Sequence, residues 1–151
     1  AFHTVERASR DSLGMLMPIY GDFVSGPNTE VGGGAPSERI IREGDLFLLD
    51  YSVVVYGYRG DFANAWVVDG KASDQIRYLH DACREALAEA EKILLPGLAA
   101  AEVDRVVRSS FAAKGLEGQF TSHSGHGLGL GHPDPPYFVP KSSDRLVEGD
   151  I

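Results

Sequence analysis

The sequence of 151 residues has a single cysteine, Cys83, so no disulfide can form within the chain. No apolar run reaches the roughly 20 residues of a membrane-spanning helix, and no secretory signal opens the sequence. Lys and Arg number 14 against 22 Asp and Glu, and the net charge of -8 disfavours nucleic acid and acidic membrane surfaces as partners. These absences predict a cytoplasmic protein that binds neither nucleic acid nor membranes.

The composition is that of an ordinary globular domain, with 43% hydrophobic and 24% charged residues. A chain of this length can bury a core of its own. It starts at Ala1 without a methionine and stops at Ile151, where a strand is expected to begin. We therefore expect residues 1–151 to form one domain that is cut at both ends.

Hydrophobic periodicity and turn signals predict a mixture of strands and helices. Ser73 is the expected N-cap of a long helix, and Gly115 is the expected residue after the end of the next helix. Cys83 falls on the apolar stripe of the first of these helices, which predicts a small core residue. Strands are expected over residues 15–24, 46–55 and 62–68, and helices over 1–13, 73–94 and 100–114.

Two aspartates stand at the ends of neighbouring strand-like runs, Asp50 after the first and Asp61 before the second. If the chain reverses between Val55 and Tyr56, the two carboxylates lie opposite each other, with Cβ atoms about 4.5–5.5 Å apart. Carboxylates that close repel, so a shared proton, a basic partner or a metal must neutralise them. Two bridged divalent ions about 3.5–4 Å apart would fit. A pair of solvated strand-end aspartates is the alternative, and this stretch alone does not decide.

Three of the five histidines lie in a glycine-rich segment, residues 122–134. Glycines on both sides of His126 leave its imidazole room to project into a shared site. Neutral imidazole is a common ligand of transition metals and complements carboxylates. His123 and His132 fit equally well in a flexible surface loop. Combined with the spaced aspartates, the segment favours a metal site.

A short internal repeat links two distant parts of the chain. Glu43-Gly44-Asp45-Leu46 recurs as Glu148-Gly149-Asp150-Ile151, each copy after Arg and aliphatic residues. A match of four residues also arises by chance. If it marks a duplicated half, the second equivalent of Asp50 lies four residues beyond Ile151.

From about Ser25 to Ile151 the sequence resembles the pita-bread metallopeptidases, which include Xaa-Pro aminopeptidase, prolidase, methionine aminopeptidase and the metal-free creatinase. The resemblance implies an α/β fold in which a curved, mainly antiparallel sheet carries helices on its outer face, with the C-terminal part missing here. It rests on Ser-Gly-Pro-Asn at 25–28, the repeated Glu-Gly-Asp, the aspartates 11 residues apart, Gly-Tyr-Arg-Gly-Asp at 57–61, and Gly-His-Gly-Leu-Gly-Leu at 125–130.

The resemblance also implies roles for three residues. Asp50 would chelate one ion, Asp61 would bridge two ions, and His126 would bind the other. Two glutamates that complete the family's site would lie beyond Ile151. The implied cofactors are two divalent metal ions (manganese, cobalt or zinc), and the implied partner is a peptide, with Xaa-Pro the leading substrate. Relatives are often dimers, so a homodimer is a further expectation.

Two substrate-handling positions depart from the family's pattern. Gly33 and Pro133 stand where the family usually has histidines, the second of which assists the tetrahedral intermediate. His132, one residue before that place, is the candidate catalytic residue. The favoured interpretation is a metal-dependent aminopeptidase or dipeptidase-like hydrolase of the Xaa-Pro type with altered substrate-handling residues.

Two alternatives stay open. One is a catalytically silent pita-bread module that binds peptides or proteins, which the residues at positions 33 and 133 favour. The other is a metal-free, creatinase-like hydrolase of a small carbon–nitrogen substrate. The retained Asp50, Asp61 and His126 argue against the metal-free enzyme, because without metal the close aspartates lack an obvious neutralising partner.

Overall fold

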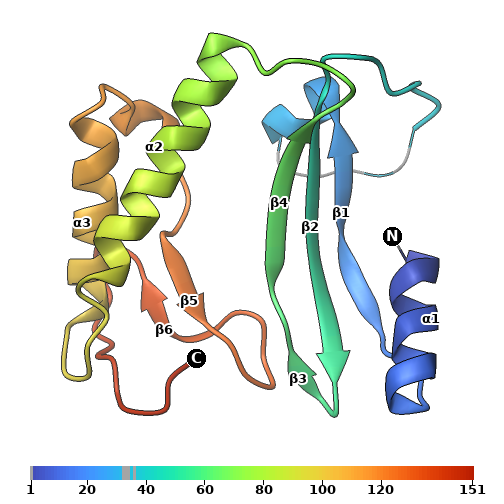
Figure 1. The fold of residues 1–151 in the computed structure, drawn as a ribbon. Helices are drawn as coiled ribbons and strands as arrows, with labels where there is room; N and C mark the ends of the chain where they lie inside the picture. The colour runs from blue at the N-terminus through green and yellow to red at the C-terminus, as the bar shows by residue number, and fades with distance from the viewer. Residues whose placement is uncertain (1, 32–34, 36) are drawn as a thin grey trace. The chain divides into compact units, whose positions relative to one another are not determined.

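A computed structural model describes residues 2–31, 35 and 37–151 as helices and antiparallel strands joined by loops (Figure 1). Gly33, one of the two departures from the family pattern, lies outside the described residues. The chain forms two compact units, Ala1–Ala72 and Ser73–Ile151. In the part of the chain that the structure describes, no helix is both long enough and apolar enough to cross a membrane.

The first unit is built on an antiparallel sheet in which the long strand β2 lies between β1 and β4 (Figure 1). A short strand, β3, pairs with the far end of β2. The helix α1 precedes the sheet, as predicted, and a 3-10 helix, η1, follows β1. The bounds are α1 Phe2–Leu13, β1 Ile19–Ser25, η1 Gly26–Val31, β2 Leu46–Val55, β3 Tyr58–Arg59 and β4 Phe62–Val67.

Aromatic rings run in a row across one face of this sheet. Phe2 of α1 lies with its ring centroid 5.0 Å from that of Phe23, and the row continues through Tyr51 to Phe62 at 6.4 and 5.6 Å. Because successive strand residues point to opposite faces, Asp50 projects from the other face of the sheet. The helix α1 therefore packs on the aromatic face and does not cover the face that carries Asp50.

The reversal after β2 corrects the predicted register. The turn residues are Tyr56 and Gly57, with φ of 52° and 90°. Two consecutive positive φ values define the two-residue turn whose twist matches the flanking strands. Asp50 consequently pairs with Ala63, so the prediction that it directly faces Asp61 was wrong. The predicted reversal would have forced β-branched Val55 into a left-handed conformation, whereas Gly57 adopts one freely.

The second unit packs two helices, α2 and α3, and carries a two-stranded sheet of β5 and β6 (Figure 1). Ser73 caps α2 as predicted, since its hydroxyl accepts a hydrogen bond of 3.2 Å from the amide of Ile76. The bounds are α2 Asp74–Glu91, α3 Ala100–Ala112, η2 Glu117–Gln119, β5 Gly125–Gly127 and β6 Asp134–Phe138. The buried core of the unit consists of Ala82, Ala86, Ala90, Ala100, Val103, Val107, Phe111 and Leu146.

The buried face of α2 is narrower than the predicted apolar stripe. Three alanines at four-residue spacing face the core, while Cys83 and Leu87 are exposed. Small side chains bring the backbones of two helices close together, which favours this narrow stripe over the bulkier one beside it. The prediction that Cys83 is a core residue was therefore wrong. On α3, Val107 and Phe111 are buried, and so is Asp104.

Candidate metal centre

Two aspartates face each other across the first sheet, but they are not the two that the sequence suggested. Asp22 of β1 is the register partner of Asp50 on β2. Residues directly opposite in an antiparallel pair have Cβ atoms about 4.5–5.5 Å apart, and like charges there destabilise the pair. The register partner of Asp50 on β4 is Ala63, and Asp61 lies two residues before it. Asp61 is therefore a diagonal neighbour of Asp50, at a separation of about 7–8 Å.

These three carboxylates thus belong to one face of the sheet, and all three residues are exposed. A cation bound there would offset their mutual repulsion. Sequence reasoning missed Asp22 because no local pattern connects it with Asp50; only the pairing of β1 with β2 does. The nearest signal was the strand expected over residues 15–24, whose register was unknown.

A buried hydroxyl lies next to the carboxylates. Ser52 is two residues beyond Asp50 on β2, on the same face, and only 5% exposed. Its Oγ is buried and has no hydrogen-bond partner among the described residues. A buried polar atom without a partner costs about 1–3 kcal/mol. An orphaned hydroxyl beside three carboxylates is what a site for a polar ligand or a hydrated cation would leave behind.

Glycine brings β1 close to this part of β2. Gly21 pairs with Tyr51, and a Cβ at Gly21 would clash with the carbonyl oxygen of Asp50. Only glycine therefore permits the approach that sets Asp22 opposite Asp50. The acidic face depends on one residue without a side chain.

His126 is oriented by its own strand. It is the central residue of β5, and its Nδ1 lies 2.8 Å from the carbonyl oxygen of Gly127. A carbonyl oxygen only accepts hydrogen bonds, so Nδ1 is the donor and, in the neutral ring, Nε2 carries the lone pair. A backbone carbonyl that holds one ring nitrogen while the other faces a metal is the usual arrangement of metal-binding histidines.

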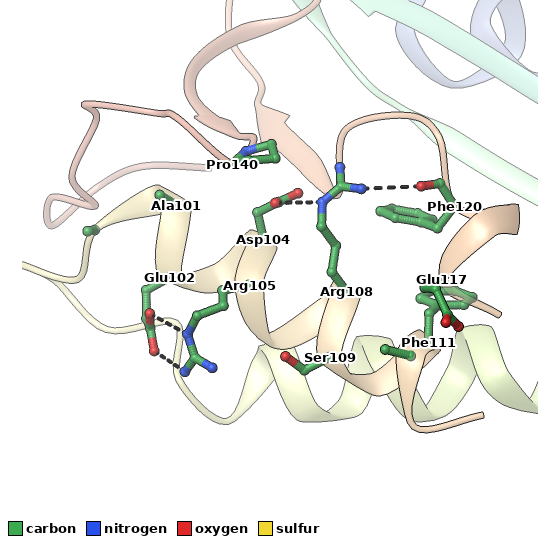
Figure 2. A pocket seen from close by; sticks show the side chains of 12 residues that line it. Ala101, Glu102, Asp104, Arg105, Arg108, Ser109, Phe111, Glu117, Phe120 and Pro140 are labelled. Carbon is green, nitrogen blue, oxygen red and sulfur yellow. Dashed lines mark hydrogen bonds and ion pairs between the residues drawn. The ribbon is translucent and has the colours of Figure 1, made fainter. Parts of the chain in front are cut away.

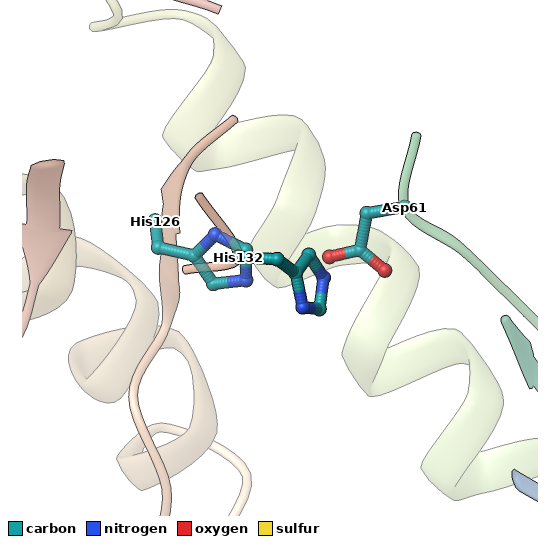
Figure 3. Close-up of side chains that lie close together, drawn as sticks. All are labelled: Asp61, His126 and His132. Atoms are coloured by element: carbon teal, nitrogen blue, oxygen red, sulfur yellow. The ribbon is translucent and has the colours of Figure 1, made fainter. Parts of the chain in front are cut away.

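His132 lies beside His126 in the loop between β5 and β6 (Figure 3). The two rings meet edge to face, with centroids 5.2 Å apart and an interplanar angle of 85°. One ligand nitrogen of each ring lies within 4.8 Å of the other. The loop is folded by Asp134, whose Oδ2 accepts a 3.0 Å hydrogen bond from the amide of Gly131. The second unit thus brings together the two histidines that the sequence singled out.

The two copies of the short repeat fold alike. In the first, Asp45 Oδ2 accepts a 2.8 Å bond from the amide of Arg42, and in the second, Asp150 Oδ2 accepts one of 2.8 Å from Val147. The glycine before the aspartate has a positive φ in both copies, 83° for Gly44 and 97° for Gly149. The first copy leads into the strand that carries Asp50. In the second, the carbonyl oxygen of Ile151 accepts a 2.7 Å hydrogen bond from the amide of Leu128, close to His126 in the sequence.

Arg39 fixes the first copy of the turn. Its two terminal nitrogens each donate a 2.7 Å hydrogen bond to the carboxylate of Asp45, whose side chain is 12% exposed. This bidentate bond, with the amide of Arg42, lowers the pKa of Asp45 to about 2. The entry to β2 is therefore held by an ion pair as well as by the turn.

Carboxylate and imidazole side chains, which the two units carry, are common ligands of divalent metals. The sequence matches Metallopeptidase family M24 over residues 3–151, and the chain belongs to this family. The α/β fold class with antiparallel sheets and helices, of the pita-bread type, is confirmed. The metallopeptidases of this family depend on divalent metal.

Solved and curated relatives agree with this assignment. A recombinant prolidase from Thermococcus sibiricus has a TM-score of 0.86 at 28% identity, over 99% of this chain and 41% of that one. A methionine aminopeptidase of Aquifex aeolicus is 33% identical over 133 residues, which are 82% of this chain and 50% of the relative. The uncharacterized peptidase YqhT of Bacillus subtilis is 32% identical over 84% of this chain and 36% of its own. The chain thus spans between about a third and a half of their length.

Proposed function

We propose that the protein is a metal-dependent hydrolase of peptides, of the Xaa-Pro type, in which Asp50, Asp61 and His126 are metal ligands. The observation that carries the proposal is the His126 ring, whose Nδ1 is held by the Gly127 carbonyl so that Nε2 is presented as a ligand. The similarity to a prolidase over nearly the whole chain supports the Xaa-Pro class. Carboxylates and imidazole suit manganese, cobalt or zinc.

The residues of each unit fit such a site. On the first sheet, Asp22, Asp50 and Asp61 share a face with the orphaned hydroxyl of Ser52. Carboxylate oxygens are strong ligands of divalent ions, and a dinuclear site needs bridging carboxylates. Two divalent ions, when bound, polarise the scissile carbonyl and lower the pKa of a water molecule.

His132 is the proposed catalytic residue. Its ring lies edge to face with that of His126 and is exposed, so substrate can reach it. A neutral imidazole at this place donates its N–H to the carbonyl oxygen of the substrate as negative charge develops there. Pro133, which occupies the family's usual histidine position, has neither a donor nor a titratable group. His132 therefore supplies the donor that Pro133 cannot.

A catalytically silent module remains the second candidate, because Gly33 and Pro133 replace histidines that the resemblance assigns to substrate handling. It predicts metal binding without peptide cleavage. A metal-free hydrolase predicts cleavage that does not depend on bound metal.

One set of measurements on the natural full-length protein separates these functions. Metal content is determined by elemental analysis after loading with Mn²⁺, Co²⁺ or Zn²⁺, and cleavage is assayed with an Ala-Pro dipeptide and a Met-Ala dipeptide. We expect bound metal, metal-dependent cleavage of Ala-Pro, and loss of both in Asp61→Asn and His126→Ala. His80→Ala, which changes an exposed histidine of α2, is the control and should keep both.

Each other outcome assigns a different function. Metal without cleavage of either dipeptide would indicate the silent module, and cleavage that survives chelation would indicate the metal-free enzyme. Cleavage of Met-Ala alone would overturn the Xaa-Pro assignment. Neither metal nor cleavage would overturn the proposal as a whole.

A further inference from the structure

A buried carboxylate on α3 is not explained by the proposed ligand set. Asp104 is 1% exposed, on the helix face that also buries Val103 and Val107. Its Oδ2 accepts a 2.8 Å bond from Nε of Arg108 (Figure 2). Its Oδ1 accepts a 2.5 Å bond from the hydroxyl of Ser124. A buried carboxylate is strongly destabilising unless it is paired and hydrogen-bonded, so both partners are needed where they are.

Arg108 extends this contact to the backbone. Its Nη1 donates to the carbonyl oxygen of Phe120 at 3.2 Å (Figure 2). Its Nη2 donates to the carbonyl oxygen of Ser122 at 2.7 Å. The guanidinium also lies over the Phe120 ring, 5.0 Å from its centroid. One planar side chain therefore binds a carboxylate, two carbonyls and an aromatic face, which a lysine could not reproduce.

These contacts fall on alternate residues of one segment. Phe120, Ser122 and Ser124 lie between η2 and β5, where the backbone forms no helix or strand. Ser124 is followed at once by Gly125, the first residue of β5, and the amide of Ser124 donates a 2.9 Å bond to the carbonyl oxygen of Phe138. Side chains of α3 thus hold the stretch that leads into His126.

The helix itself is firmly placed. Val103, Val107 and Phe111 belong to the buried core, and the Phe111 ring stacks on Phe120 at 4.9 Å. A segment without secondary structure gains a fixed position when it is bonded to such a helix. The strand β5 has only three residues, so its own ladder of hydrogen bonds is too short to fix the position of the segment.

We propose that Asp104, Arg108 and Ser124 are positioning residues for His126, which fix the start of β5 against α3. The proposal rests on the proposed function for its effect on metal binding, but not for its effect on the segment. Loss of a residue that orients a metal-binding histidine typically lowers metal affinity about 10–100-fold. Removing the arginine also leaves the Asp104 carboxylate buried without its cation.

The same helix offers a matched control. Arg105 pairs with Glu102, three residues before it, through Nε at 2.8 Å. Its side chain is 62% exposed, and that of Glu102 is 41% exposed. Arg105→Met and Arg108→Met therefore make the same chemical change. Only Arg108 contacts the segment, whereas Arg105 pairs with Glu102 instead. Arg105→Met should leave the histidine strand unaffected.

The first measurement is hydrogen exchange of the metal-free full-length protein. We expect Arg108→Met to speed exchange of the amides of residues 120–127 selectively, and Arg105→Met to leave them unchanged. Equal exchange in the two variants, or an even rise over α2, α3 and the segment together, would overturn the proposal in favour of general destabilisation.

The second measurement is Co²⁺ binding, followed by titration calorimetry and by the absorption spectrum of the bound ion. Ser124→Ala should weaken binding about tenfold or more and alter the spectrum, whereas Ser124→Thr keeps the hydroxyl and should restore both. Wild-type affinity and spectrum in Ser124→Ala would overturn the positioning role. If the wild-type protein binds no Co²⁺, the proposed function fails, and the exchange measurement still decides whether these residues position the segment.

Discussion

The two units hold their candidate site residues in different ways. The second unit has a closed core of alanines, valines and Phe111 between its helices, and its histidine segment is bonded to that core through Asp104 and Arg108. In the described part of the first unit, the buried side chains are Ser9, Val24 and Ser52, and its aspartates lie on an exposed sheet face. Packing thus places the imidazoles, whereas strand register places the carboxylates.

The two Glu-Gly-Asp turns repeat this contrast on a small scale. In both, the glycine has a positive φ and the aspartate carboxylate accepts a hydrogen bond from the backbone amide three residues before it. In the first turn the carboxylate of Asp45 also binds the guanidinium of Arg39. The local sequence is therefore enough to form the turn, and the side chain of Arg39, six residues before Asp45, adds the ion pair that sets the turn's response to pH.

The largest expected effect tests the difference between the cores. Phe111→Ala removes a side chain that is 9% exposed and stacked on Phe120, so it should lower the free energy of unfolding by about 3–5 kcal/mol. Phe62→Ala, at a position 54% exposed in the first unit, should cost less than about 1.5 kcal/mol, the value of its ring contact with Tyr51. Chemical denaturation of both variants measures this, and similar losses would contradict the comparison.

His132 tests whether an exposed residue of the second unit is functional. His132→Ala should lower turnover about 10²–10³-fold and leave metal content intact, because one donor to the developing oxyanion is lost. His123→Ala is the control, since its ring lies 5.4 Å from that of His126 but the substitution should leave turnover near the wild-type value. Steady-state kinetics with metal analysis decides between a catalytic His132 and an ordinary loop residue, which would give wild-type turnover.

Acid stability distinguishes the first turn. The pKa of Asp45 is lowered to about 2 in the folded state, so its contribution is fully present above the unfolded pKa of roughly 3.9 and is lost as the pH falls towards 2. Asp45→Asn should therefore be less stable than wild type above about pH 4, and the difference should shrink through this window. Thermal unfolding from pH 2 to 7 measures it.

The partner of this ion pair provides the check. Arg39→Met should produce a loss over the same pH range, and the double variant should lose little more than either single one, because both remove one interaction. A difference between Asp45→Asn and wild type that stays constant down to pH 2 would show that the ion pair does not set the acid response.

The smallest expected effect concerns Asp22. Asp22→Asn removes a like charge from the position opposite Asp50, so it should stabilise the metal-free protein by about 0.2–1 kcal/mol. With metal bound, the gain should vanish or reverse, because the cation already offsets the repulsion. Unfolding with and without Mn²⁺ compares the two states, with Asp11→Asn on α1 as control. An identical gain in the free energy of unfolding with and without Mn²⁺ would show that Asp22 is not part of the metal site.

The sequence by itself determined the local elements and the chemistry of the candidate ligands. Ser73 ends a turn and caps a helix through its own hydroxyl, and the repeated Glu-Gly-Asp forms the same turn twice, because these bonds join residues only three apart. The 11-residue spacing of Asp50 and Asp61 and the glycines beside His126 are also local features, and from them the sequence predicts a metal site.

Only the tertiary structure decided which side chains meet. The register of Asp50 depended on a positive φ at Tyr56 and Gly57, and its pairing with Asp22 depended on the approach of β1 through Gly21. The burial of Asp104 is accompanied by a hydrogen bond from Ser124, which lies 20 residues further along the chain. Such contacts join residues that are distant or irregularly spaced in the sequence, and a periodic pattern carries no information about a partner that arrives from another part of the chain.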